Sequence, residues 1–220
     1  MTLGAVAVEV GVLALQGDFA AHTLALESLG VSVREVRRPA HLDGLRALVL
    51  PGGESTTLLE LFALERLDES IVRFHADGGA LFGTCAGLIV LAREVVDPPQ
   101  ESLRLLDCVV ARNAYGRQVN SFSEPGRVEF GESERGDGDG GERGERVLET
   151  NFVFIRAPRI VSVGPEGTVL ARRGDDPVLV RSGRVLGATF HPELIRPAAV
   201  HRYFVREVAG MELPAGLVGG

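Results

Sequence analysis

The first half of the chain alternates short, mostly apolar runs with longer stretches in which apolar residues recur at helical spacing. The apolar runs predict strands that are buried on both faces, at residues 6–15, 31–36, 47–50 and 80–82. The other stretches predict helices at residues 19–29, 57–67, 69–76 and 88–92. Strands that alternate with helices in this way are typical of an open, mostly parallel α/β sheet.

Polar residues and glycines predict where two of these helices begin or end. Asp18 is a suitable N-cap for the first helix, and Gly30 is a suitable C-terminal stop. Ser55 or Thr56 is predicted to cap the helix at 57–67, directly after a Gly-Gly turn.

The pattern changes after Ala92, where short β-like pieces follow one another without helices. Residues 103–110 and 119–128 predict smaller antiparallel strands added to the core sheet. Later strands are predicted at residues 160–163, 168–170, 177–181 and 184–188, as a meander that closes the sheet edge. A last helix is predicted at residues 198–208.

One segment differs in kind from the rest. Gly131 to Arg146 holds six glycines, six acidic residues and three arginines, and no hydrophobic residue. Such a composition cannot contribute to a core, so a flexible loop is expected there. With 220 residues in all, we expect one domain over residues 1–210 and a frayed tail over 211–220.

Composition narrows the function classes. The net charge of −7 argues against nucleic acid as a partner, and no apolar run is long enough to span a membrane. The start of the chain lacks the basic region of a secretory signal, and two cysteines make no disulfide framework, so a cytoplasmic location is expected. No Cys-x-x-Cys or His-x-x-x-His pair is present, so no metal site is expected. All 23 basic residues are arginine, which excludes a lysine Schiff base and a phosphate-loop lysine.

The strongest chemical signal is the Gly-Thr-Cys-Ala-Gly sequence around Cys85, between a predicted strand and a predicted helix. This is the cysteine form of a nucleophile elbow, in which flanking glycines permit a tight, strained turn. A thiol at a helix N-terminus is favoured as thiolate. The alternative from this stretch alone is a small buried cysteine in a glycine-rich turn.

A base for this nucleophile is available later in the chain. His191 directly follows a predicted strand, and Glu193 is spaced to hold the far nitrogen of its imidazole. The other histidines lie on predicted helices or loops without such a partner, and we expect structural or surface roles for them: His22, His41, His75 and His201.

An oxyanion site and a carboxylate site are also suggested, more weakly. The Gly52-Gly53 turn exposes backbone N–H groups at the end of a strand, so Gly53 and Ala86 are candidate oxyanion donors. An ordinary strand–helix turn would look the same. Arg112 precedes an aromatic residue and a second arginine, a set that can hold a carboxylate, although a solvated turn is the simpler interpretation from these residues alone.

Taken together, these segments resemble class I, triad-type glutamine amidotransferases, and among them the glutaminase subunits of pyridoxal 5′-phosphate synthase. The resemblance spans Val10 to about Val208. Its most specific segments are Pro51-Gly52-Gly53-Glu54-Ser55-Thr56-Thr57 and Phe154-Ile155-Arg156-Ala157-Pro158.

The resemblance implies a flavodoxin-like three-layer α/β/α sandwich with a mostly parallel central sheet and added antiparallel strands. It implies Cys85 as nucleophile, His191 as acid/base and Glu193 as its orienter. It implies that L-glutamine is bound by Gly53, Glu54, Ser55, Arg112, Ile155 and Arg156. It implies no cofactor, and a partner: a separate (β/α)8-barrel synthase subunit that receives the ammonia within a large hetero-oligomer.

Two other functions stay open from the sequence. One is a free-standing cysteine hydrolase of the same elbow type, which acts on a γ-glutamyl or peptide bond. The other is a non-catalytic flavodoxin-like binding module that retains an unused thiol.

Overall fold

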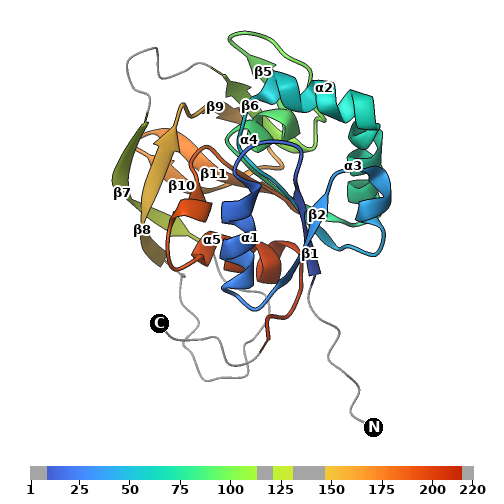
Figure 1. Cartoon of the computed structure of the whole chain (residues 1–220). Helices are drawn as coiled ribbons and strands as arrows, with labels where there is room; N and C mark the ends of the chain where they lie inside the picture. Colours follow the sequence, from blue (N-terminus) through green and yellow to red (C-terminus); the bar gives the residue numbers. More distant parts are fainter. Residues whose placement is uncertain (1–8, 113–120, 131–146, 215–220) are drawn as a thin grey trace.

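The computed structural model describes residues 9–112, 121–130 and 147–214 (Figure 1). Its strands are β1 (Glu9–Leu13), β2 (Ser32–Val36), β3 (Ala47–Leu50), β4 (Ala80–Thr84), β5 (Ala92–Val96), β6 (Leu106–Ala111), β7 (Ser121–Glu129), β8 (Val147–Ile155), β9 (Arg159–Val163), β10 (Thr168–Arg173), β11 (Asp176–Ser182) and β12 (Val185–Ala188). Its helices are α1 (Phe19–Glu27), α2 (Ser55–Glu65), α3 (Leu67–Ala76), α4 (Ala86–Leu91) and α5 (Ala199–Tyr203), with short turns η1 (Pro39–Leu42) and η2 (Pro192–Leu194) and a π-helical segment η3 (Phe204–Val208).

Within these residues, the main sheet has the strand order β2-β1-β3-β4-β12-β11-β10-β7-β8. The first five of these strands run parallel, and the remaining ones are joined antiparallel. β12 pairs with β4 in register, with Ala188 opposite Thr84. The carboxyl ends of β3, β4 and β12 are therefore neighbours at one edge of the parallel half.

Side chains alternate between the two faces of the parallel strands and build two separate cores. Val49 and Phe82 face one side, where α1, α5 and η3 cover the sheet. Leu48, Leu50 and Leu81 face the other side, under α2, α3 and α4. Figure 1 shows α1 and α5 side by side on their face although they lie far apart in the sequence. The three-layer α/β/α sandwich with a mostly parallel sheet is confirmed.

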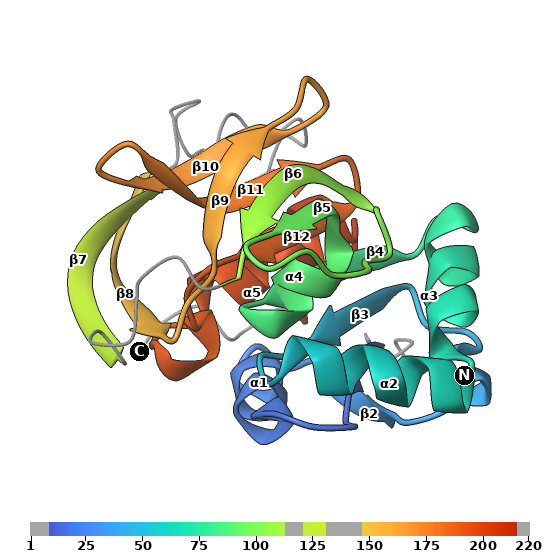
Figure 2. The ribbon, with the colours of Figure 1, turned by 90° about the horizontal axis from the view of Figure 1, so that it is seen from above.

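A smaller sheet with the order β5-β6-β9 differs from expectation. β5 was not predicted, because it follows α4 without an intervening turn and its exposed Arg93 and Glu94 interrupt the apolar pattern of a buried strand. β6 was expected in the core sheet but pairs with β5 and β9 instead. Cys108 and Val110 of β6 belong to the same buried core as the side chains of α4. Figure 2 shows β5, β6 and β9 close to α4.

β12 was predicted as part of a meander at the sheet edge, and this is wrong, because β12 lies at the centre between β4 and β11. β11 and β10 do form antiparallel hairpin partners, while β9 belongs to the smaller sheet. The four residues of β12 are all buried, as a strand flanked on both edges and both faces requires. The pattern of apolar residues along a sequence predicts where strands are, but it does not predict the order of the strands in the sheet.

Of the two predicted helix N-caps, one agrees with the structure and the other does not. Asp18 caps α1 as predicted, accepting a hydrogen bond from the backbone N–H of Ala21. Glu54, and not Ser55 or Thr56, caps α2: its carboxylate accepts from the backbone N–H of Thr56 at 3.3 Å. A glutamate reaches this donor because its longer side chain folds back over the first turn.

Several predictions lie outside the described residues. These are the flexible loop at 131–146, the second arginine after Arg112, and most of the terminal tail. Met211 is described and is buried, with its backbone N–H donating to Val205 O at 3.0 Å. Among the described helices, none has the length and apolar character that crossing a membrane requires.

The approach of α4 to β3 depends on a residue without a side chain. A Cβ at Gly87 would overlap the backbone carbonyl of Leu50, and a Cβ at Gly83 would press on the backbone of Gly87. β3, β4 and the start of α4 are therefore in backbone contact, which fixes the position of the residue between β4 and α4.

We predict that Gly87→Ala destabilises the protein by about 3 kcal/mol, because overpacking outweighs the gain of about 1 kcal/mol in helix propensity. Gly44→Ala is the control: it has open space around it but a φ of +77°, so only backbone strain of about 1 kcal/mol is expected. Urea unfolding followed by far-UV circular dichroism measures both. A Gly87→Ala protein as stable as the parent would contradict the close approach.

Candidate active site

Three loops meet at the carboxyl ends of adjacent parallel strands. Gly52 and Gly53 follow β3, Cys85 follows β4, and His191 comes three residues after the end of β12. Ligands of open α/β sheets bind at this end of the strands. Residues from positions 52, 85 and 191 thus converge because their strands are neighbours.

Cys85 lies in a strained turn between β4 and α4, with φ 49° and ψ −104°. Its backbone N–H donates to Ala188 O at 2.9 Å, and its carbonyl accepts from Ile89 N at 3.1 Å. The residue is 7% exposed, and Sγ lies 3.8 Å from Ile155 O. A positive φ in a residue with a side chain costs about 1–3 kcal/mol, and such strain is typical of functional turns.

His191 and Glu193 form a buried pair. The ring nitrogen Nδ1 of His191 lies 2.7 Å from Glu193 Oε1, and the backbone N–H of His191 donates to Val153 O at 2.8 Å. With Nδ1 bound to the carboxylate, the other nitrogen, Nε2, is left as the basic one. This Nε2 is buried and has no hydrogen bond to any described residue.

Gly52 lies between the cysteine and the histidine. A Cβ at Gly52 would stand 3.4 Å from the Cβ of Cys85 and 2.8 Å from Cε1 of His191. The two side chains therefore flank the same small space, close to one another but not aligned for a hydrogen bond to Nε2. Such loose alignment is common before a substrate is bound.

The pair has shifted pKa values. Burial by itself lowers the pKa of His191, but interactions with Cys85 and with the Glu193 carboxylate outweigh it and raise the pKa to about 10. Burial by itself raises the pKa of Glu193, but the contact with His22 and the hydrogen bond from His191 lower it below its usual range. Glu193 is thus ionised at neutral pH, which suits an orienting carboxylate.

His22 is a residue whose place the sequence did not predict. It was expected to have no carboxylate partner, and this is wrong: Nε2 lies 3.4 Å from Glu193 Oε2. The available signal was its position on α1, three and four residues before the buried Ala25 and Leu26. A histidine on the apolar face of a helix needs polar partners in the core.

The candidate oxyanion turn is braced by a neighbouring loop. Gln16 holds it at Glu54: Nε2 of Gln16 donates to Glu54 O at 2.5 Å, and its Oε1 accepts from Glu54 N at 3.4 Å. Gly53 has φ +148°, and Gly17 has φ +79° with no room for a Cβ against Gly52 O. Ala86, the other candidate donor, is the first residue of α4.

The residues expected to bind glutamine are distributed around this turn. Arg112 Nη2 lies 3.3 Å from Glu54 Oε1, and Ile155 contributes the carbonyl next to Sγ of Cys85. A hydrogen bond from Thr56, opposed by burial and aided by the charges of Arg112 and then Arg156, lowers the pKa of Glu54.

Two further residues of the expected glutamine site, Arg156 and Ser55, have a distinctive backbone angle and a distinctive hydrogen bond respectively. Arg156 has a positive φ of 44°. Ser55 is buried, with its hydroxyl donating to Gln100 Oε1 at 2.9 Å. The proton of the Ser55 hydroxyl is therefore already used in a hydrogen bond to Gln100.

Comparison with known proteins agrees with this geometry. The model of the SNO glutamine amidotransferase family matches residues 12–210. The chain belongs to the SNO glutamine amidotransferase family. A solved structure described as "Crystal structure of glutamine amidotransferase" is 46% identical with a TM-score of 0.80, and the match covers 92% of this chain and 99% of that one.

Curated relatives of this glutamine amidotransferase are similar over nearly their whole length. Pyridoxal 5′-phosphate synthase subunit PdxT of Deinococcus radiodurans is 50% identical over 203 residues, which cover 89% of this chain and 95% of the relative. The protein of the same name from a strain of Thermus thermophilus is 50% identical over 204 residues, which cover 92% and 98%.

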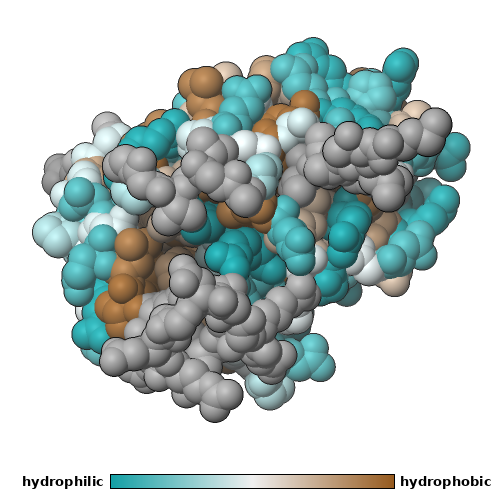
Figure 3. All heavy atoms as spheres, turned by 90° about the horizontal axis from the view of Figure 1, so that it is seen from below, coloured by the Kyte–Doolittle hydropathy of each residue, from teal (hydrophilic) through white to brown (hydrophobic). Residues whose placement is uncertain are grey.

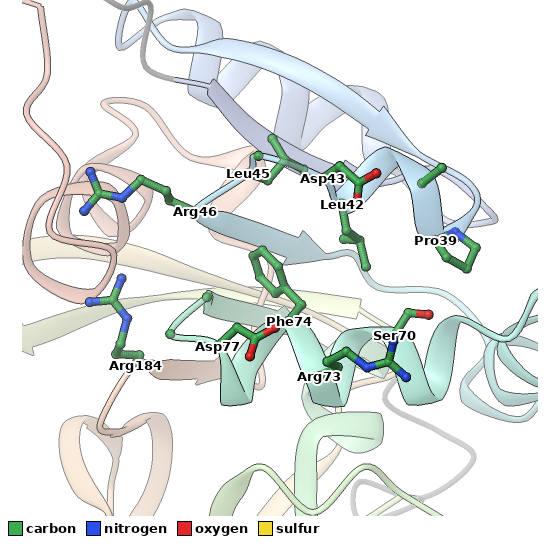
Figure 4. A pocket seen from close by; sticks show the side chains of 14 residues that line it. Pro39, Leu42, Asp43, Leu45, Arg46, Ser70, Arg73, Phe74, Asp77 and Arg184 are labelled. Atoms are coloured by element: carbon green, nitrogen blue, oxygen red, sulfur yellow. The ribbon is translucent and has the colours of Figure 1, made fainter.

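A cavity of about 650 Å³ lies at the opposite end of the strands, where β3, β4 and β12 begin. Figure 4 shows Arg73 and Phe74 of α3 and Asp77, directly after the helix, on one side, with Arg46 and Arg184 together at one end. Seen from below, this end of the molecule is largely hydrophilic where it is not covered by grey atoms (Figure 3). The cavity contains no residue of the triad.

The two cysteines should react very differently with a glutamine-like electrophile. Burial raises the pKa of the Cys108 thiol to about 12, with the charge of Arg93 offsetting only part of this, so little thiolate forms at pH 8. We predict modification of Cys85 alone, measured by mass spectrometry of the digested protein. Cys85→Ala is the control and should take up no label; label on Cys108 would count against the assignment.

Substitution of the orienting carboxylate should change the titration of the base. Glu193 stabilises the protonated imidazole of His191, so Glu193→Gln should move the pKa of His191 from about 10 to lower pH. Ring ¹⁵N shifts recorded against pH measure this. The signals of His41 and His75 should be the same in both proteins, and a His191 titration that does not move would show that the carboxylate has no such effect.

Proposed function

We propose that this chain is the glutaminase subunit of a pyridoxal 5′-phosphate synthase, acting through one domain over residues 1–210. It hydrolyses L-glutamine to L-glutamate and ammonia and delivers the ammonia to a synthase partner. The observation that carries this is the convergence of Cys85 with the bonded pair His191–Glu193 at the carboxyl ends of β4 and β12, in a chain of this family.

The first half of the reaction follows from these positions. The proton of Cys85 is held on His191 Nε2, as the raised pKa of this imidazole favours, and the thiolate attacks the side-chain amide carbon of glutamine. The oxyanion that forms is stabilised by the backbone N–H groups of Gly53 and Ala86. The imidazolium of His191 then protonates the amide nitrogen, which leaves as ammonia, and a γ-glutamyl thioester remains on Sγ.

The second half repeats the same proton movements with water. His191 takes a proton from a water molecule as it attacks the thioester carbonyl, and the second tetrahedral intermediate is held by the same two N–H groups. Its collapse releases glutamate and returns Cys85 to the thiol. Glu193 keeps the proton on His191 Nδ1 throughout, so that Nε2 stays the working nitrogen.

Charged groups beside the cysteine suit the amino-acid end of glutamine. Arg112 and Arg156 are suited to the α-carboxylate, and Glu54, ionised beside them, is suited to the α-ammonium. Gly53, Ser55 and Ile155 complete the site on either side of Cys85. This arrangement would place the side-chain amide toward Sγ and Ile155 O.

The partner is proposed to be a (β/α)8-barrel synthase subunit in a large hetero-oligomer. This chain contains no lysine, so imine chemistry on a sugar phosphate must occur on another protein. A division between an ammonia-producing chain and an ammonia-consuming chain agrees with that absence. It also agrees with curated relatives that are named as synthase subunits.

The test is glutamate release by the chain alone and with the barrel subunit present. We expect the partner to raise kcat at least about tenfold, Cys85→Ala to abolish activity, and Cys108→Ala to leave it unchanged within about twofold. Equal activity with and without the partner would favour a free-standing hydrolase. Ammonia production that survives Cys85→Ala would overturn the catalytic proposal altogether.

A further inference from the structure

A buried polar cluster lies behind the triad and is not used in the reaction steps above. It consists of His22 from α1, Thr84 at the end of β4, Glu193 in η2 and His201 from α5. His22, Thr84 and His201 are fully buried and Glu193 is 2% exposed. Four elements from distant parts of the chain thus bring polar side chains into one dry space, where each polar atom needs a partner.

The distances define a chain of contacts that leads to the triad. His201 Nε2 lies 2.9 Å from His22 Nδ1. His22 Nε2 lies 3.1 Å from Thr84 Oγ1 and 3.4 Å from Glu193 Oε2. The other oxygen of Glu193 is hydrogen-bonded to His191, whereas Oε2 has no hydrogen bond among the described residues and is approached by His22 at ion-pair distance.

His201, the member of the cluster farthest from the triad, determines which ring nitrogens carry protons. His201 Nδ1 is buried and has no hydrogen-bond partner among the described residues. Burial lowers the pKa of His201 to about 3, so its ring is neutral and carries one N–H. A proton on Nδ1 would be a buried unpaired donor, whereas a proton on Nε2 makes the 2.9 Å bond to His22.

The position of the proton on His201 determines the position of the proton on His22. If His201 donates from Nε2, Nδ1 of His22 must accept with its lone pair. The proton of a neutral His22 is then on Nε2, against Thr84 Oγ1 and Glu193 Oε2. The opposite tautomer of His22 would direct a lone pair at the carboxylate. Its Nδ1–H would either face the N–H on Nε2 of His201 or force the proton of His201 onto Nδ1, where it would be a buried donor without a partner among the described residues.

We infer that His22 is a positioning residue of the active site, fixed by His201 as the Nε2–H tautomer and holding the oxygen of Glu193 that His191 does not bind. This role rests on the proposed function. A carboxylate with a histidine against each oxygen is restrained from rotating, so Oε1 stays on Nδ1 of His191 and Nε2 stays on the side of the ring away from the carboxylate. His22 touches no substrate and acts only through Glu193.

Other charged groups also face this carboxylate and must be considered in any pH experiment. Arg196 donates from Nη1 to the backbone carbonyl of Glu193 at 3.1 Å, and its charge also acts on His201. His191 contacts the carboxylate at its other oxygen, and Cys85 acts on His191 in turn. With a pKa of about 10 for His191 and about 3 for His201, neither imidazole changes its charge near neutral pH.

The proton arrangement is tested on the full chain without an activity assay. Long-range ¹H–¹⁵N spectra at pH 7 report which ring nitrogen of each histidine carries a proton, and His22→Gln and His201→Gln assign the signals. We expect His22 protonated on Nε2 only and His201 protonated on Nε2 only. A proton on Nδ1 of His22, whether as the other tautomer or as the doubly protonated ring, would overturn the inference.

The positioning role is tested by kinetics of the assembled complex. His22→Leu removes the N–H donor and should lower kcat for glutamine by about 10- to 100-fold, the usual effect of losing a hydrogen bond to a charged group, with KM changed less than about twofold. Because His22 lowers the pKa of Glu193, its loss should also move the acid limb of the kcat profile to higher pH. His22→Gln places an amide N–H near the position of Nε2 and should restore both.

The matched control is Leu26→Ala, which weakens packing on the same buried face of α1 without touching Glu193. It should lower stability while leaving the acid limb in place. An unshifted limb and unchanged kcat in folded His22→Leu would refute the positioning role even if the tautomer is as expected. Loss of the proposed glutaminase itself would appear separately, as activity that survives Cys85→Ala.

Discussion

The buried carboxylate of Glu193 is the constraint on which the active site depends. Removing an ionised group from water is costly unless its oxygens are paired. Here one oxygen is 2.7 Å from His191 and the other is 3.4 Å from His22. Breaking either contact would leave one carboxylate oxygen without a partner in a dry interior, so the carboxylate ties η2 to α1 and, through His22 and His201, to α5.

A second constraint acts at the backbone of the nucleophile. The strained turn at Cys85 persists because hydrogen bonds to Ala188 and Ile89 hold both of its peptide groups. The glycines at 83 and 87 let α4 start against the carbonyl of Leu50. The same contacts that store strain at Cys85 therefore also set its distance from the Gly52 turn, and an added methyl group at either glycine would move the thiol.

The two constraints meet through the order of the strands. β12 lies beside β4, so the residue that follows β12 reaches the residue that follows β4. If β12 were at the sheet edge, His191 would be several strand spacings of about 4.8 Å away from Cys85. The antiparallel strands β11, β10, β7 and β8 extend the sheet beyond β12 and bring Ile155 back to the thiol.

The sequence by itself determined the α/β class, most strands and helices of the first half, and the elbow, histidine and glutamate as candidates, because these follow from local periodicity and from short-range spacing. Tertiary structure alone decided the central place of β12, the separate sheet of β5, β6 and β9, and the cap at Glu54. It also decided the role of His22, since a helix pattern shows which face is buried but not which distant polar group lies against it. Contacts between residues 179 positions apart, such as His22 and His201, are set by the packing of α1 on α5.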